Sequence, residues 1–261
     1  MTLSLIGKVT RSSNVGMGSI LYYGDLWRSI RMDPINFIVV CTDKYSAEYA
    51  NKSLNMFKRN FQGDFSSFCI TDKKDQISEE FICIEKDPRL SGWWNKLSIF
   101  NQILPHENTL YVDLDLLIMN SVTDVLKFAD QIIADYEIAC FGDHVHWHGE
   151  QFGSAFMFFQ QKKMRWIYEE FIQDLNANML TAGGDQIWLG QRLSKVIYLE
   201  EHISNLVKSL KFDLAKWSAD RTKIIIPNEI ADDFILLNCH GQPKPHQLVE
   251  MNWKPIKNIW Y

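Results

Sequence analysis

The sequence has no apolar stretch approaching the roughly 20 residues that a membrane-spanning helix needs, so no transmembrane segment is expected. The first residues include Lys8 and Arg11 but no long apolar segment, so no secretory signal peptide is expected. Cysteine is sparse: there are five, an odd number, and none form a C-x-x-C pair. These features argue against a disulfide framework and favour reduced, buried thiols in a cytoplasmic protein.

Positive charge is not in excess either. A formal net charge of −5 argues against a nucleic-acid partner or a broad anionic-membrane surface, although it allows a small basic pocket. Internal repeats, low-complexity tracts and proline- or glycine-rich linkers are missing, so residues 1–261 are expected to form a single domain. The composition itself is that of a globular protein, with 46% hydrophobic and 23% charged residues.

The beginning of the chain predicts alternating strands and helices. Residues 4–10 have the composition of a strand, residues 19–31 carry apolar side chains at helical spacing, and residues 35–41 form a continuous apolar strand. This β-α-β start favours an α/β fold with a mostly parallel central sheet flanked by helices. Residues 44–86 are expected to be less regular. Further elements are expected at 82–84, 93–103, 110–119, 122–134, 137–141, 154–160, 163–175, 185–193, 195–199, 223–226 and 234–238.

The most informative motif is the run from Leu110 to Met119, in which an apolar stretch leads into Asp113 and Asp115. Side chains alternate faces along a strand, so the two carboxylates are expected to point the same way. Two like charges at the end of a buried strand repel each other, and a divalent cation relieves that repulsion. The alternative is a strand that simply ends in a polar loop.

A second motif, NCHGQPKPH, follows a late apolar strand at residues 238–246. Gly241 allows a ligand to approach the backbone closely, and Lys244 offers a point charge suited to phosphate. His240 and His246 are potential metal ligands or phosphate donors. The alternative is a proline-rich turn that happens to hold two histidines.

Three shorter patterns complete the set. After Gly183 and Gly184, the pair Asp185 and Gln186 is suited to binding a sugar, or Asp185 simply caps a helix. Lys96, in GWWNKL, is placed to reach a diphosphate, while its tryptophan neighbours suit a core. Three histidines alternate in HVHWHGE: His144, His146 and His148. Such a run is suited to binding a transition metal or to lining an acceptor pocket, and the alternative is an ordinary loop.

In this order, the motifs resemble those of nucleotide-sugar glycosyltransferases of the GT-A fold, and most of all the glycogenin-like group with its bacterial and viral relatives. The resemblance runs from about residue 3 to residue 246. It rests on five segments: GWWNKLSIF, YVDLDLLI, FGSAFMFF, GDQ and HGQPKPH. It implies a single GT-A (Rossmann-like) domain with a nucleotide-binding half at 3–120, a donor-sugar and acceptor half at 121–250, and an aromatic tail at 251–261.

The resemblance also implies roles for individual residues. Mn²⁺ or Mg²⁺ would be held by Asp113 and Asp115, with His240 as a third ligand. The nucleotide diphosphate would meet Lys96, Asp113, Gly241 and Lys244, and its base would lie near Asp43 and the turn at residues 9–14, which contains Thr10 and Arg11. Asp185 and Gln186 would serve the sugar and the catalytic step.

The implied reaction moves a sugar from a nucleotide-diphosphate sugar to an acceptor hydroxyl, with retention of the anomeric configuration. The acceptor is expected to be a glycan, a lipid-linked sugar or a protein, with no nucleic-acid partner. Four positions depart from the group's pattern. Asn238 stands where the group has its metal-binding histidine, Gly153 replaces a sugar-contacting asparagine, Ala155 a glycine, and His246 a tryptophan.

Two other interpretations remain open. One is a metal-dependent nucleotidyltransferase, which also uses paired aspartates but leaves the HGQPKPH loop unexplained. The other is a catalytically degenerate sugar-nucleotide-binding module. The tail WKPIKNIWY, for its part, suits either packing on the domain or contact with a membrane interface or an acceptor glycan.

Overall fold

A computed structural model describes residues 31–143, 152–218, 224–230 and 233–261 of the chain. Residues 32–261 form one compact unit. The predicted strand at 4–10 lies outside the described residues, as does the predicted helix at 19–31 except for Arg31. The turn with Thr10 and Arg11 also lies outside them, as do His144, His146 and His148.

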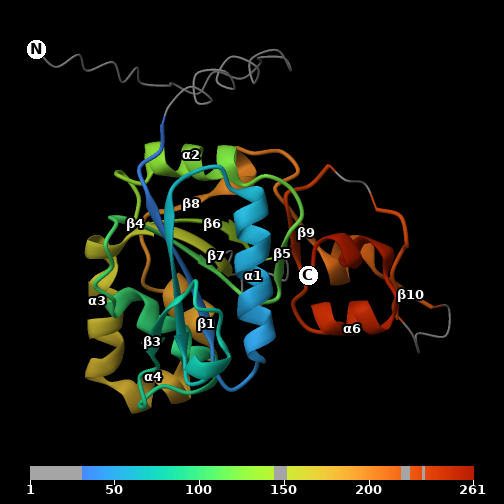
Figure 1. The fold of residues 1–261 in the computed structure, drawn as a ribbon. Coiled ribbons are helices and arrows are strands. Elements are labelled where there is room, and N and C mark those ends of the chain that lie inside the picture. Colours follow the sequence, from blue (N-terminus) through green and yellow to red (C-terminus); the bar gives the residue numbers. More distant parts are fainter. Residues whose placement is uncertain (1–30, 144–151, 219–223, 231–232) are drawn as a thin grey trace, which may run out of the picture. The chain divides into compact units, whose positions relative to one another are not determined.

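Seven strands of the described residues form the central sheet (Figure 1). All run parallel except β7, which lies antiparallel between β4 and β6. This confirms the α/β class and the mostly parallel sheet. The β1 sequence INFIVVC is almost entirely buried, as expected for a strand covered on both faces. In spatial order, the strands are β3 (Ile82–Glu85), β2 (Phe65–Thr71), β1 (Ile35–Cys41), β4 (Asn108–Val112), β7 (Phe152–Gln160), β6 (Ile138–Gly142) and β8 (Val196–Tyr198).

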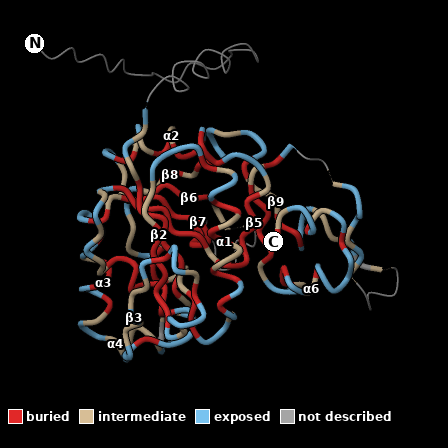
Figure 2. Tube along the Cα trace, in the orientation of Figure 1, coloured by how far each residue is buried: buried red, intermediate tan, exposed pale blue. Residues whose placement is uncertain are grey.

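Helices cover both faces of this sheet. Neighbouring residues of β1 point to opposite faces, so Phe37 stacks on Phe57 of α1 (Ala47–Asn60) while Ile38 belongs to a second core cluster. That cluster includes Phe171 and Trp188 and gathers η3 (Gly92–Asn101), α3 (Gln161–Gln173) and α5 (Asp185–Gly190). Figure 2 shows the buried residues concentrated along the sheet. The other helical segments are η2 (Lys74–Gln76), α2 (Thr123–Ile132), α4 (Leu175–Thr181), η5 (Leu199–Glu201), the π-helical turn η6 (Leu210–Leu214), α6 (Pro245–Glu250) and η7 (Lys254–Asn258).

The expectation of irregular structure across residues 44–86 is wrong. This stretch contains α1, a helix of 14 residues, and the seven-residue strand β2. The buried residues Ala50, Leu54 and Phe57 recur every three or four positions along α1. Polar side chains between them hide this stripe, and two serines in β2 mask a strand whose last five residues are buried.

The strand predicted through Asp113 and Asp115 is also broken. β4 ends at Val112, and the chain turns before β5 (Leu116–Ile118) begins. β5 leaves the central sheet and pairs with β12 (Leu236–Asn238), which in turn pairs with β9 (Val207–Ser209). The turn is held by hydrogen bonds from the Asp113 N–H to the Ala155 carbonyl at 2.8 Å and from the Leu116 N–H to the Asp113 carbonyl at 3.0 Å. The aspartates therefore lie in a turn that links two sheets.

The C-terminal segment packs on the domain, because Trp253, Ile256 and Trp260 are buried. A two-stranded ribbon, β10 (Lys216–Trp217) with β11 (Ile224–Ile225), completes the described elements. Among the described residues, no helix combines the length and the apolar character needed to cross a membrane.

Candidate active site

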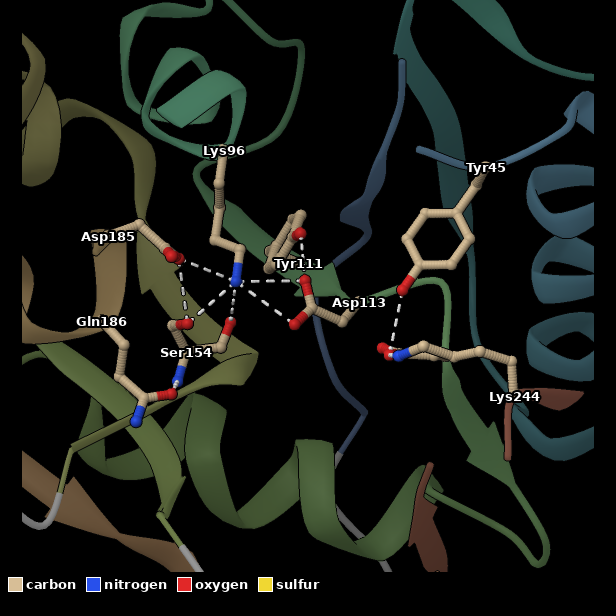
Figure 3. Close-up of polar contacts among 9 residues, drawn as sticks. Tyr45, Lys96, Tyr111, Asp113, Ser154, Asp185, Gln186 and Lys244 are labelled. Carbon is tan, nitrogen blue, oxygen red and sulfur yellow. Dashed lines mark hydrogen bonds and ion pairs between the residues drawn. The ribbon is translucent and has the colours of Figure 1, made fainter. Parts of the chain in front are cut away.

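A cavity of about 700 Å³ opens beyond the carboxyl ends of β1 and β4. In open α/β sheets this edge is where ligands bind. The cavity gathers most of the predicted site residues from separate parts of the chain: Lys96, Asp113, Asp115, Asp185, Gln186, His240, Gly241 and Lys244. Figure 3 shows the polar contacts at its centre.

The turn between β4 and β5 presents both Asp113 and Asp115 to the cavity. Burial raises the pKa of Asp113, the Lys96 ammonium opposes that rise, and the nearby charge of Asp115 adds to it. The predicted conflict between two close carboxylates is therefore present, although a turn rather than a strand creates it.

Lys96 lies at the centre of the first charge cluster. Its ammonium is 3.1 Å from a carboxylate oxygen of Asp113 and 2.9 Å from one of Asp185, and it donates to the Ser154 hydroxyl at 2.8 Å. Burial alone would lower the pKa of Lys96, but Asp113 and Asp185 outweigh burial and raise it. The amine is therefore charged at neutral pH.

Asp185 is the first residue of α5 and follows Gly184, whose φ of 148° is in the range that favours glycine. Its carboxylate bonds with Lys96 and accepts from the Ser154 hydroxyl at 3.1 Å, and no side chain caps this helix. The capping interpretation of Asp185 is therefore wrong. Gln186 also lines the cavity, and its side-chain oxygen accepts from the Ser154 N–H at 3.4 Å.

The late loop supplies the second charge cluster. Lys244, at the start of α6, donates a hydrogen bond to Asp115, which also accepts one from the Tyr45 hydroxyl at 2.9 Å. Burial and the charge of Asp115 raise the pKa of Tyr45, so its hydroxyl stays protonated as a donor. Gly241 adopts φ 76°, and its cavity side is almost open, since the nearest atom to an added Cβ would be Cδ of Lys211 at 4.0 Å.

The two histidines of this loop separate. His240 lines the cavity, with Nε2 2.9 Å from the Ser209 hydroxyl and its ring stacked on Phe212. His246 instead bonds through Nδ1 to the hydroxyl of Tyr49, on α1. His246 therefore fastens α6 to α1, whereas His240 stays at the cavity.

Asp113 and Asp115 fit two ligand positions of Mg²⁺ or Mn²⁺, which commonly take one or two carboxylates together with substrate phosphates. Within the part of the chain that the structure describes, no group of three or more His, Cys, Asp or Glu side chains is placed to hold a metal ion. Substrate phosphate oxygens could supply further ligands. His240 as a ligand stays a prediction.

Several cavity residues were not predicted as site residues. Tyr45 follows the end of β1, Tyr111 donates from β4 to Asp113, and Ser154 on β7 contacts both Lys96 and Asp185. The only sequence signal was position: Tyr45 comes four residues after an apolar strand, and Ser154 is the first residue of the strand predicted at 154–160. The predicted base contacts Thr10 and Arg11 lie outside the described residues.

Gly153 has a packing role. A Cβ at this position would lie 2.3 Å from the Phe141 carbonyl oxygen on the neighbouring strand β6. An asparagine, which the resembling group has there, would collide with that backbone. The glycine therefore reflects close strand packing in this chain.

No protein-family model and no curated protein matches the chain. Solved structures do. The galactosyltransferase LgtC in complex with donor and acceptor sugar analogs superposes with a TM-score of 0.57 at 15% identity, covering 85% of this chain and 93% of LgtC. An active-site mutant of LgtC gives 0.56 at 14% identity with the same coverage.

The glycosyltransferase GlyE of Streptococcus pneumoniae TIGR4 gives a TM-score of 0.58 at 14% identity. The match covers 86% of this chain and 61% of GlyE. Together with the sheet order, these likenesses define an α/β domain with a mostly parallel central sheet. More narrowly, its fold is the GT-A-like fold of glycosyltransferases.

Proposed function

We propose that the protein is a metal-dependent glycosyltransferase that moves a sugar from a nucleotide-diphosphate sugar to an acceptor hydroxyl with retention. One observation carries the proposal: ion pairs at the carboxyl edge of the sheet join two buried ammonium groups to three carboxylates within one cavity. They are Lys96, Lys244, Asp113, Asp115 and Asp185. Cations and paired carboxylates together suit a leaving diphosphate and a divalent ion.

At the diphosphate end, Asp113 and Asp115 would hold the divalent ion. When bound, that ion supplies Lewis-acid stabilisation of the departing diphosphate. Lys244, at the start of α6, adds a fixed positive charge beside Asp115. Gly241 has no side chain, so a phosphate oxygen can approach the loop backbone closely.

At the sugar end, Asp185 and Gln186 face the cavity and would contact sugar hydroxyls and the positive charge that develops at the anomeric carbon. One carboxylate oxygen of Asp185 is already occupied by Lys96 and Ser154. This occupancy does not suit a free nucleophile. It supports attack by the acceptor hydroxyl from the side of the leaving phosphate, which retains the configuration.

The acceptor is proposed to be a hydroxyl of a glycan, a lipid-linked sugar or a protein. The solved LgtC structure holds analogs of both donor and acceptor sugars, and this supports a sugar acceptor for the present chain. The net charge of −5 is consistent with a neutral acceptor more than with a polyanionic one.

The proposal is tested by thermal unfolding with UDP, GDP and CDP, each with and without Mn²⁺ or Mg²⁺. Ligand at about 100 times its dissociation constant stabilises the native state by about 2.7 kcal/mol. For a chain of this size, the midpoint should rise by roughly 5–10 °C. The rise should need the metal, and Asp115→Asn should abolish it while Asp135→Asn, on the exposed surface, should not.

The chemistry is tested by incubating the protein with the nucleotide-sugar of the stabilising base. Release of nucleoside diphosphate, with the anomeric configuration of the product preserved in its NMR spectrum, is expected. Release of pyrophosphate from a nucleoside triphosphate would instead identify a nucleotidyltransferase. Nucleotide binding without turnover would identify a degenerate binding module, and a midpoint that no nucleotide changes would refute the proposal.

A further inference from the structure

Four separate elements bring polar groups to one buried nitrogen. The residues are Lys96 on η3, Asp113 in the β4–β5 turn, Ser154 on β7 and Asp185 on α5, and together they are called the Lys96 hub (Figure 3). Lys96 and Asp185 are each only 8% exposed and Ser154 only 3%. This degree of burial is unusual for a lysine, which is normally exposed unless it is paired.

The contacts of the Lys96 nitrogen use all of its hydrogens. An ammonium has three N–H donors. The acceptors are an Asp113 oxygen at 3.1 Å, an Asp185 oxygen at 2.9 Å and the Ser154 hydroxyl at 2.8 Å, and the Ser154 carbonyl lies at 3.3 Å. A phosphate oxygen could gain a hydrogen bond from Lys96 only by displacing one of these buried partners.

Lys244 differs in this respect. Its ammonium contacts one carboxylate, that of Asp115, and a backbone carbonyl, that of Cys239, at the long distance of 3.4 Å. It therefore keeps donor capacity for a phosphate oxygen. Lys96 and Lys244 therefore have different environments, although the resemblance assigns both to the diphosphate.

We propose that Lys96 is a positioning residue that holds Asp113 and Asp185 in register, and that it does not bind the diphosphate. This inference rests on the proposed function. Asp113 stands at the diphosphate end of the cavity and Asp185 at the sugar end, so the ammonium between them sets the spacing of the two half-sites. Attractions of this kind are stronger in a buried site than in water. The bond that breaks in the donor joins those half-sites, so its orientation depends on their spacing.

The first experiment compares the affinities of UMP and UDP, or of the mono- and diphosphate of whichever base stabilises the wild-type protein. The dissociation constant of the monophosphate is divided by that of the diphosphate, both measured by calorimetry with Mn²⁺. This ratio reports contacts to the second phosphate. In Lys96→Met the ratio should stay within about twofold of wild type. In Lys244→Met it should fall roughly tenfold or more, the effect of losing a charge-assisted hydrogen bond. An equal fall in Lys96→Met would overturn the proposal.

The second experiment measures turnover. Lys96→Met should lower kcat by roughly 100-fold, the scale of a misplaced reacting group, with little change in donor KM. If Lys96 acts through Asp185, the double variant Lys96→Met/Asp185→Asn should be hardly slower than Asp185→Asn alone. Fully additive losses, or an unchanged kcat in the folded variant, would contradict a positioning role.

Removing one charge from a buried pair can prevent folding, so a second route is needed. Ser154→Ala keeps all three charged groups of the hub and deletes one acceptor, the Ser154 hydroxyl. It should lower kcat and leave the mono- to diphosphate ratio unchanged, and a changed ratio with normal kcat would contradict the inference. If the proposed function is wrong, the wild-type protein itself will not bind nucleotide. That result would also overturn the positioning role proposed for Lys96.

Discussion

At the scale of single residues, Gly153 is a position where one added carbon meets rigid backbone. Gly153→Ala would place Cβ 2.3 Å from the Phe141 carbonyl oxygen, which is part of the backbone and cannot rotate away as a side chain can. We expect the free energy of unfolding to fall by about 1–3 kcal/mol, the usual cost of overpacking. Urea unfolding measures it, and a variant as stable as wild type would show that the sheet adapts.

A second residue-scale prediction concerns Asp87, which pairs with Arg89 at 2.7 Å and accepts a hydrogen bond from Tyr168. Arg89 is the main cause that lowers the pKa of Asp87 from 3.8 to about 2. A lowered pKa stabilises the fold above the unfolded value near 3.8, and this contribution is lost as the pH falls towards 2.

Asp87→Asn should therefore reduce the free energy of unfolding at pH 7 by roughly 1–2 kcal/mol. The difference from wild type should shrink when the pH falls from 4 to 2. Urea unfolding at several pH values tests this, with Asp75→Asn as an exposed control. A difference that is constant with pH would assign the effect to shape and not to charge.

The sequence predicted those cavity residues that directly follow apolar strands or begin a helix. Asp113 and Lys244 belong to this group, because strand ends and glycine-bearing loops leave a local signal. Tyr45 and Ser154 leave only the weaker signal of lying near an apolar strand. Their roles depend on which strands are neighbours, and Ser154 reaches Lys96 and Asp185 only because β7 lies beside β4.

At the scale of elements, the C-terminal segment and α1 are joined through aromatic rings. Trp260 is 4% exposed and packs edge-on against Tyr49 at 4.7 Å, and Tyr49 bonds with His246. The tail therefore helps to fix α6, the helix that begins with Lys244.

Trp260→Ala should lower the free energy of unfolding by roughly 3–5 kcal/mol, the usual cost of removing a buried tryptophan. Tyr261→Ala is the matched control, since Tyr261 is 58% exposed. Its effect should stay below about 1 kcal/mol even though its ring faces Arg59. Equal effects of the two variants in chemical unfolding would contradict the described packing of the tail.

The elements themselves were predicted unevenly. Continuous apolar strands such as β1 were found because both faces of a central parallel strand are buried. The sequence does not reveal helix α1 because lysines and asparagines interrupt its buried stripe. It does not reveal the break after Val112 because the spacing of apolar residues does not show where the chain passes from one sheet to another.

At the scale of the whole molecule, all five cysteines are free thiols, and four of them are buried. Burial raises the pKa of each of the five, to about 11 for Cys41, so little reactive thiolate forms near neutral pH. A disulfide-exchange reagent at pH 8 should therefore modify native protein slowly, with Cys83 first because it is only partly buried.

After unfolding in guanidinium, all five thiols should react quickly. The contrary result, rapid reaction of several thiols in the native state, would mean that the core opens readily. Cys83→Ser provides the control that assigns the first thiol.

The fold class followed from the β-α-β start and from apolar strands placed between helices. The strand order could not be predicted in this way, because the antiparallel position of β7 inside a parallel sheet depends on pairing between strands distant in sequence. No local composition specifies that pairing.

The pairing of β5 with β12 has a kinetic consequence. It joins residues 116–118 to residues 236–238, and the bond between Lys244 and Asp115 spans 129 positions of sequence. Contacts this distant form slowly, since a long loop must close before they give any stabilisation. During synthesis, the turn with both aspartates emerges long before the strand and lysine that complete it. A nascent or proteolytically shortened chain therefore carries Asp115 without the Lys244 ammonium that pairs with it in the folded protein, and the cavity is complete only when the final segment has docked.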